Sequence, residues 1–230
     1  MEPATATAES SAAPILLSQF DDLDQQQQAS NLGMWMFLAT EVMFFGGLIV
    51  AYVVYRALSP REFALASRHL DMWLGFVNTI VLLSSSLAMA LAVRSAQLHR
   101  SRQVLNYLLI TMALGTCFLG IKAVEYYREY EEKLIPALNF QLPAEALESQ
   151  LVKPGRFEMF FVLYFFMTGL HAFHLIIGIT LVGVIALLSR RKWLSGGGET
   201  QIEVTGLYWH FVDIVWVFLY PLLYLIDVKS

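Results

Sequence analysis

The sequence has few charged residues and almost no cysteine. Charged side chains make up 15% of its 230 residues, against roughly 25% in a soluble globular domain, and 57% of the residues are hydrophobic. This composition excludes an ordinary soluble domain and indicates a membrane protein. The single cysteine, Cys117, cannot form an internal disulfide, and we interpret it as a small core residue. The net charge of −4 gives no indication of nucleic-acid binding.

Residues 1–31 contain no lysine or arginine and no apolar stretch long enough for a secretory signal. They are rich in small, acidic and glutamine residues, which cannot bury enough apolar surface to become ordered. We therefore expect a flexible tail over residues 1–31 and a transmembrane domain over residues 32–230.

Five long apolar runs follow this segment. They lie near residues 32–56, 72–93, 104–126, 158–188 and 204–227. Each run reaches the length of about 20 residues that a helix needs to cross a bilayer core of about 30 Å. The sequence therefore predicts an all-α integral membrane protein, a bundle of five transmembrane helices with its termini on opposite sides.

The connections between the runs bear on orientation. Residues 94–102 and 189–193 are short and each carry three basic residues and no acidic one. Dense positive charge in short loops is typical of the cytoplasmic side, so we expect a cytoplasmic N-terminus, although a plain sum of bases favours the reverse. The connection at 127–156 is long and polar, and we expect a short amphipathic helix there on the outer surface.

Ionisable side chains inside the runs are costly in a bilayer and indicate function. They are Glu41, His171, His174, His210 and Asp213, with Lys122 and Glu125 toward one end of the third run. An unpaired carboxylate at mid-depth is expected to be protonated, because desolvation disfavours the charged form. Glu41 can then serve as a helix-to-helix hydrogen bond or as a proton-handling group, and both alternatives stay open.

The histidines also allow more than one interpretation. His171 and His174 are three residues apart and share a helix face, so with His210 they can in principle form a three-histidine metal site or hold one haem b. The favoured interpretation is that hydrogen-bonded histidines tie the fourth and fifth helices together, with no metal bound. Lys122 and Glu125 are expected to form an interface pair or to extend toward lipid headgroups.

Five motifs occur in an order that resembles the cytochrome c oxidase subunit III family. They are WMFLATEVMFFGG (35–47), FVNTIVLLSSS (76–86), VEYYREY (124–130), TGLHAFHLIIG (168–178) and YWHFVDIVWVFLY (208–220). The resemblance implies an accessory subunit of a proton-pumping haem–copper oxidase in the bacterial cytoplasmic membrane. It implies no catalytic residue, metal or redox cofactor in this chain, with haem and copper in partner subunits.

The resemblance also implies partners and bound lipid. Such a subunit packs directly on catalytic subunit I. Through subunit I it is associated indirectly with subunit II and with cytochrome c or a respiratory supercomplex. Its helices are split by a V-shaped, lipid-filled cleft, which we expect between the first two predicted helices and the other three. The aromatic side chains expected to line the cleft are Phe44, Phe45, Trp73, Tyr126, Trp209 and Trp216.

By position, the resemblance assigns support of proton uptake to a buried polar cluster. Its members are Glu41, His171, His174, His210 and Asp213. The alternatives are the equivalent subunit of a quinol oxidase or a nitric oxide reductase, and, in a different class, a haem b membrane anchor. A transporter is disfavoured because the sequence has no internal repeat and no pair of broken helices.

Overall fold

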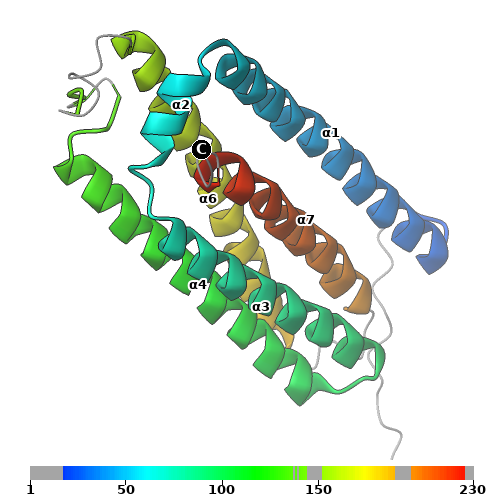
Figure 1. Cartoon of the computed structure of the whole chain (residues 1–230). Coiled ribbons are helices and arrows are strands. Elements are labelled where there is room, and N and C mark those ends of the chain that lie inside the picture. Colours follow the sequence, from blue (N-terminus) through cyan, green and yellow to red (C-terminus); the bar gives the residue numbers. More distant parts are fainter. Residues whose placement is uncertain (1–17, 137, 139, 144–151, 190–197, 226–230) are drawn as a thin grey trace, which may run out of the picture.

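The computed structural model describes residues 18–136, 138, 140–143, 152–189 and 198–225, and all regular structure in these ranges is α-helical (Figure 1). The helices are α1 (Leu23–Leu58), α2 (Pro60–Ser67), α3 (Met72–Gln97), α4 (Ser101–Glu131), α6 (Pro154–Ser189) and α7 (Glu199–Tyr224). All of them except α2 are long and apolar enough to cross a membrane. The prediction of an all-α membrane protein with five spans is therefore confirmed.

Helix α1 starts earlier than the apolar run that it contains. The Asp22 side chain accepts a hydrogen bond of 2.6 Å from the backbone N–H of Gln25, and such a cap satisfies an N–H that has no partner in the first helical turn. The glutamine-rich stretch from Leu23 is consequently helical. Our prediction of a flexible tail over 1–31 is wrong for that stretch, and residues 1–17 lie outside the described ranges.

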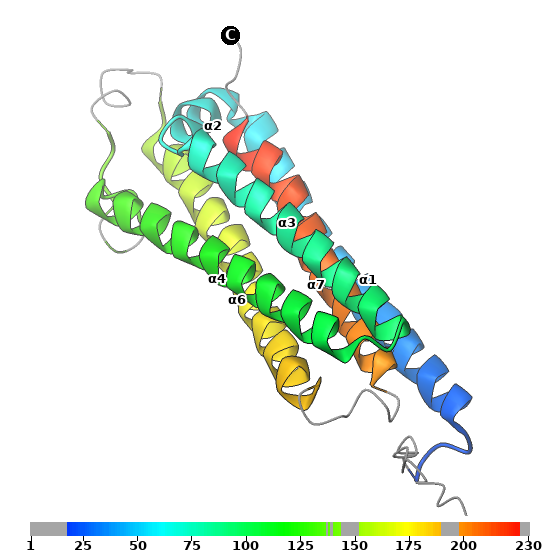
Figure 2. The same cartoon turned by 90° about the horizontal axis from the view of Figure 1, so that it is seen from below.

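The short helix α2 was not predicted. Pro60 stands in its first turn, where the missing N–H of proline costs no hydrogen bond. Phe63 of α2 is fully buried and its ring packs against Tyr52 and Phe160. Helix α2 therefore closes one end of the bundle, which we call the α2 end. The last turns of α4 and α7 and the first turns of α3 and α6 lie at the same end (Figure 2).

Helix α7 lies between α1 on one side and α3 with α4 on the other (Figure 1). Helix α6 packs against α4, α7 and α2. The closest partners of α3 are α4 and α7, not α1. The prediction that a cleft separates the first two spans from the last three is therefore wrong, because the second span, α3, packs with the larger group of helices.

Trp209 shows how small residues allow this packing. The indole ring is fully buried, and a side-chain carbon added at Gly115 would lie only 2.8 Å from it, or 3.1 Å from it at Gly178. Its N–H donates to the hydroxyl of Ser85 at 3.1 Å, which gives the buried indole the partner that it needs. The ring thus joins α7 to α3, α4 and α6.

The six aromatic residues predicted to line a lipid cleft do not share one surface. The two that are exposed on the outside are Phe44 and Trp73. The three that are buried in the protein core are Phe45, Trp209 and Trp216. Tyr126 is half-buried, and its hydroxyl is 2.6 Å from that of Thr168. The prediction that these rings line one cleft is wrong, because half of them pack against other helices.

Helix α4 continues to Glu131, beyond the predicted end of the third run. The following residues, described for 132–136, 138 and 140–143, form turns and irregular structure without a helix. The amphipathic helix expected in the connection at 127–156 falls in part on residues 144–151, which lie outside the described ranges.

Candidate functional site: polar side chains inside the bundle

Glu41 and His174 face each other between α1 and α6. The Nε2 atom of His174 lies 3.2 Å from Oε2 of Glu41, with 18% of the glutamate and 10% of the histidine side chain exposed. Their distance is that of an ion pair, but the approach does not have the direction of a hydrogen bond. The fold thus supplies across the bundle the partner that Glu41 lacks along the chain.

The position of the protons on the His174 ring follows from the contact of its other nitrogen, Nδ1. Nδ1 of His174 is 2.9 Å from the carbonyl oxygen of Leu170, and a carbonyl can only accept, so Nδ1 carries a proton. In a neutral imidazole Nε2 is then an acceptor, ready for a proton from Glu41. A neutral carboxylic acid beside a neutral imidazole, or a carboxylate beside an imidazolium, both fit the geometry.

His171 is buried without a polar partner. Its ring packs against Phe118 and Trp216, with centroid distances of 5.5 Å and 5.2 Å, and neither nitrogen makes a hydrogen bond within the described part of the chain. The hydrogen bonds that join α6 to α7 do not use a histidine ring: the Tyr208 hydroxyl donates to the backbone carbonyl of His174 at 2.9 Å, and the hydroxyls of Tyr164 and Tyr224 are 3.4 Å apart. The prediction that the histidine rings tie these two helices together is therefore wrong.

His210 joins α7 to α3 instead. Its Nδ1 is 2.7 Å from the hydroxyl of Ser86. One turn further along α7 lies Asp213, which is 3% exposed and has no hydrogen-bond partner for either oxygen among the described residues. The Ser86 hydroxyl is near enough to Asp213 to interact with it, but its short contact is with His210.

Asn78 completes this set of unpaired groups. It is fully buried on α3, and neither its amide nitrogen nor its oxygen has a partner among the residues that the structure describes. A buried polar group without a partner is costly, so such groups in a native fold call for water, a proton or another chain. Our prediction missed Asn78 because it considered ionisable residues only, although a lone asparagine in an apolar run is the same kind of signal.

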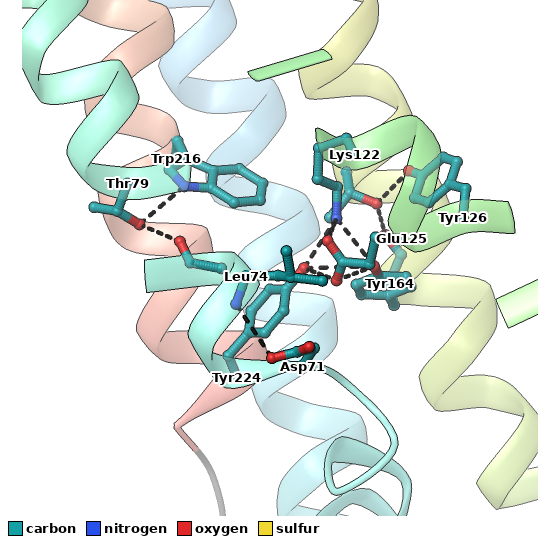
Figure 3. A network of polar contacts seen from close by, with 11 residues as sticks. Asp71, Leu74, Thr79, Lys122, Glu125, Tyr126, Tyr164, Trp216 and Tyr224 are labelled. Atoms are coloured by element: carbon teal, nitrogen blue, oxygen red, sulfur yellow. Dashed lines mark hydrogen bonds and ion pairs between the residues drawn. The ribbon is translucent and has the colours of Figure 1, made fainter. Parts of the chain in front are cut away.

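A second polar cluster lies near the α2 end and is fully paired (Figure 3). The Lys122 ammonium donates to Glu125 Oε2 at 3.0 Å and to the hydroxyls of Tyr164 and Tyr224 at 3.0 and 2.9 Å. An ammonium has three N–H donors, so all are used. Both tyrosine hydroxyls also donate to Glu125 Oε1. We call these four residues the Lys122 cluster.

The surroundings of the Lys122 cluster are aromatic. The ammonium lies 5.0 to 5.6 Å from the centroids of four rings, those of Tyr126, Tyr164, Trp216 and Tyr224, a range in which cation–π attraction operates. The predicted pairing of Lys122 with Glu125 is confirmed. The alternative that they extend to headgroups is wrong, since each side chain is only 4% exposed. The two tyrosines were missed because neutral hydroxyls were not sought.

An open groove lies between α1 and α3 with α7 as its floor, at the end opposite α2. Its volume is about 500 Å³. Asn31 and Trp35 line it from α1, Gln97 from α3, and Glu203 and His210 from α7. Gln97 donates to Glu203 at 2.8 Å across the groove. The groove therefore has a polar mouth near the helix ends and reaches His210.

The three histidines considered for a metal or haem turn toward different partners. His174 faces Glu41, His210 faces Ser86, and His171 packs between aromatic rings. Within the described ranges, no three His, Cys, Asp or Glu side chains lie close enough together to hold a metal ion. The three rings therefore lie in separate surroundings within the described part of the bundle.

Comparison with known proteins agrees with this architecture. The family model described as cytochrome c oxidase subunit III matches residues 21–130 and 157–228, which cover all five membrane-spanning helices except the last residue of α4 and the first three of α6 and leave most of the long connection unmatched. The chain is 29% identical to cytochrome c oxidase subunit 3 of Thermostichus vulcanus, over 85% of this chain and 86% of the relative.

Two further relatives differ in their electron donor. Cytochrome c oxidase subunit 3 of Alkalihalophilus pseudofirmus is 28% identical, over 86% of each chain. The probable quinol oxidase subunit 3 of Staphylococcus aureus is 23% identical, over 90% of this chain and 93% of the relative. Since the family model covers well over half of the sequence, the chain belongs to the cytochrome c oxidase subunit III family.

Proposed function

We propose that this chain is subunit III of a haem–copper oxidase, an accessory membrane subunit that packs on the catalytic subunit and supports proton uptake during oxygen reduction. The family match across all five spans supports the assignment to such a complex. Oxygen reduction itself belongs to partner subunits that carry haem and copper. This chain contributes helix packing, lipid contacts and buried acid–base groups.

The observation that carries the role in proton uptake is the contact between Glu41 and His174. A carboxyl and an imidazole at 3.2 Å, each largely buried, can hold one proton between them once a small rotation aligns the two groups, because either partner can carry it. Transfer of this proton from one partner to the other leaves the net charge buried at mid-membrane unchanged. In this proposal, Glu41 and His174 hold α1 and α6 in place beside the site where protons enter the catalytic subunit.

We assign cytochrome c as the electron donor, since the cytochrome c oxidase relatives are more similar to this chain than the quinol oxidase relative. An affinity tag on this chain, followed by purification from mild detergent, tests the assignment. Haem-containing partner chains and oxygen consumption with reduced cytochrome c are expected. Consumption with quinol alone would reassign the donor. A haem spectrum from this chain by itself would overturn the proposal in favour of a haem anchor.

We place the N-terminus in the cytoplasm, on the basis of the basic connections. In a Cys117→Ser background, single cysteines at Ser101 and Arg61 report the two sides, because both positions are exposed at opposite ends of the bundle. A membrane-impermeant maleimide added to intact cells should label the cysteine at position 61 and spare that at position 101. The reverse pattern would invert the orientation.

We propose that the groove between α1 and α3 holds a phospholipid, in place of the cleft expected from the sequence. Its polar mouth at Asn31, Trp35 and Gln97 suits a headgroup, and the exposed apolar faces of α1 and α3 suit acyl chains. The substitution Ala90→Phe should fill the groove and reduce the phospholipid retained by the purified protein. Leu87→Phe, on the exposed face of α3 outside the groove lining, should leave lipid retention unchanged. Equal retention in both variants would contradict the proposal.

A further inference from the structure

A separate pocket opens at the α2 end beside the Lys122 cluster. Its volume is about 290 Å³, which is room for several water molecules. The α2–α3 connection lines one side with His69 and Asp71, and α4 lines the other with Glu125 and Glu129. The pocket therefore leads from the helix ends to buried carboxylates.

Glu129 is the unusual member of this lining. It is 3% exposed, and neither of its oxygens has a hydrogen-bond partner among the described residues. The hydroxyl of Tyr164 is near enough to interact with it, but the proton of that hydroxyl is donated to Glu125. The Lys122 ammonium also acts on Glu129 electrostatically, but its three N–H groups go to other acceptors.

Of the two arginines that line the pocket, Arg68 and Arg128, the latter is paired with an aspartate. Arg128 lies 3.5 Å from Asp71. No ion-pair partner for Glu129 is found in the described part of the chain, and no group of three acidic, histidine or cysteine side chains there can hold a metal ion. An anionic Glu129 would thus be buried beside a second carboxylate, Glu125, without a cation of its own, which is strongly unfavourable.

We propose that Glu129 is a proton-binding site, a neutral carboxylic acid that exchanges its proton with water in the pocket at the α2 end. The neighbouring Lys122 cluster keeps its ion pair, since Lys122 and Glu125 neutralise each other. Uptake or release of a proton at Glu129 changes the charge of the pocket and leaves the paired cluster intact. The site lies apart from Glu41 and His174 and has its own access to the aqueous phase.

Charged and titratable groups surround Glu129 on every element that packs against it. Those on α4 are Lys122, Glu125, Tyr126, Arg128 and Glu132. Those on other elements are Tyr164 of α6, Tyr224 of α7, and Arg68, His69 and Asp71 between α2 and α3. Arg68 has an interaction of its own. Because these neighbours carry charges of both signs, they do not by themselves decide whether Glu129 is protonated. The proposal rests instead on the burial of the two Glu129 oxygens without a hydrogen-bond partner among the described residues.

Infrared spectroscopy of the full-length chain in lipid nanodiscs tests this site. The carbonyl stretching band of a neutral carboxylic acid should lose intensity in Glu129→Gln. It should be unchanged in Glu132→Gln, the matched control, because Glu132 lines the same pocket but is exposed. Transfer to heavy water should shift the Glu129 component promptly, since the pocket is open. A spectrum that Glu129→Gln leaves unchanged would overturn the proposal.

A measurement on the wild-type chain avoids dependence on variants that fold poorly. A water-soluble carbodiimide, which requires a protonated carboxyl, should modify Glu129, and mass spectrometry of the α4 peptide should locate the adduct. The extent of modification should fall as the pH rises, and Glu125 should stay unmodified. An adduct on Glu125 with none on Glu129, or modification of Glu129 that does not depend on pH, would overturn the proposal.

Discussion

The Lys122 cluster is buried, and so are the mid-bundle polar groups Asn78, His171 and Asp213, but the two sets differ in how far their hydrogen-bonding capacity is used. In the Lys122 cluster each ammonium N–H has an acceptor, and Glu125 accepts from Lys122, Tyr164 and Tyr224. At mid-bundle the oxygens of Asp213 have no partner in the described structure. The first region is a closed network, and the second has unused capacity.

This difference separates a structural role from a functional one. A fully satisfied buried network rigidifies the packing around it, and the Lys122 cluster joins α4, α6 and α7 in this way. A buried group without a partner lowers stability, so its presence at His171, Asp213 or Asn78 requires another explanation. We propose that contact with protons, water or the catalytic partner supplies that explanation, and each of the following substitutions tests part of the contrast.

The largest effect is expected from Lys122→Met. This change leaves the Glu125 carboxylate buried without its cation, and breaking a buried pair in this way costs about 3–5 kcal/mol. The free energy of unfolding of the purified chain in mixed micelles measures the loss. The double variant Lys122→Met/Glu125→Gln removes both charges and should recover most of it. A single variant that loses less than about 0.5 kcal/mol, as at an ordinary surface position, would contradict the structural role.

A smaller effect is expected at Glu41. Glu41→Ala removes the partner of His174 and leaves a small void, which should cost about 1–3 kcal/mol and loosen the subunit from its complex. Glu41→Gln keeps the shape and a donor, so assembly and most of the oxygen consumption should be retained. Oxygen consumption and subunit content of the purified complex check both variants. Loss of turnover in an assembled Gln variant would make Glu41 an obligatory proton carrier.

The smallest effect is expected at Ser86. Ser86→Ala removes the contact with His210 and should cost about 1 kcal/mol, measured as a shift in the unfolding midpoint. Ser84→Ala is the matched control, because the exposed Ser84 hydroxyl donates to the Ile80 carbonyl of its own helix and not to a neighbouring helix among the described residues. If the two variants are equally stable, the link between α3 and α7 through His210 contributes nothing measurable.

The fold was largely predictable because membrane helices are marked by long apolar runs. The five spans follow from this pattern, and their motifs resemble one family. The helical start at Leu23 was not predicted, because glutamine-rich composition is shared by disordered segments and by helix formers. The grouping of α3 with α4 and α7 was also beyond the sequence, since apolar residues surround each helix and the packing face is not marked.

For the site, the sequence predicted which ionisable residues matter but not which of them meet. Glu41 and His174 lie 3.2 Å apart although a long stretch of chain separates them, and no spacing rule links different helices. Glu129 was missed because it stands among charged residues at the end of a span, where exposure is the ordinary expectation. The burial of Lys122 depends on Tyr164 and Tyr224, whose hydroxyls become partners only in the folded bundle.

The contrast between the two regions is tested most directly by treating the wild-type complex with a hydrophobic carbodiimide and locating the adduct by mass spectrometry. Such a reagent enters from the lipid and reacts with a protonated carboxyl. We expect modification of Glu41, which is partly exposed and by our proposal holds the proton that it shares with His174, and none of Glu125, whose carboxylate is paired with Lys122. Modification of Glu125, or an unmodified Glu41, would contradict the assignment of a structural role to the Lys122 cluster and a proton-handling role to Glu41.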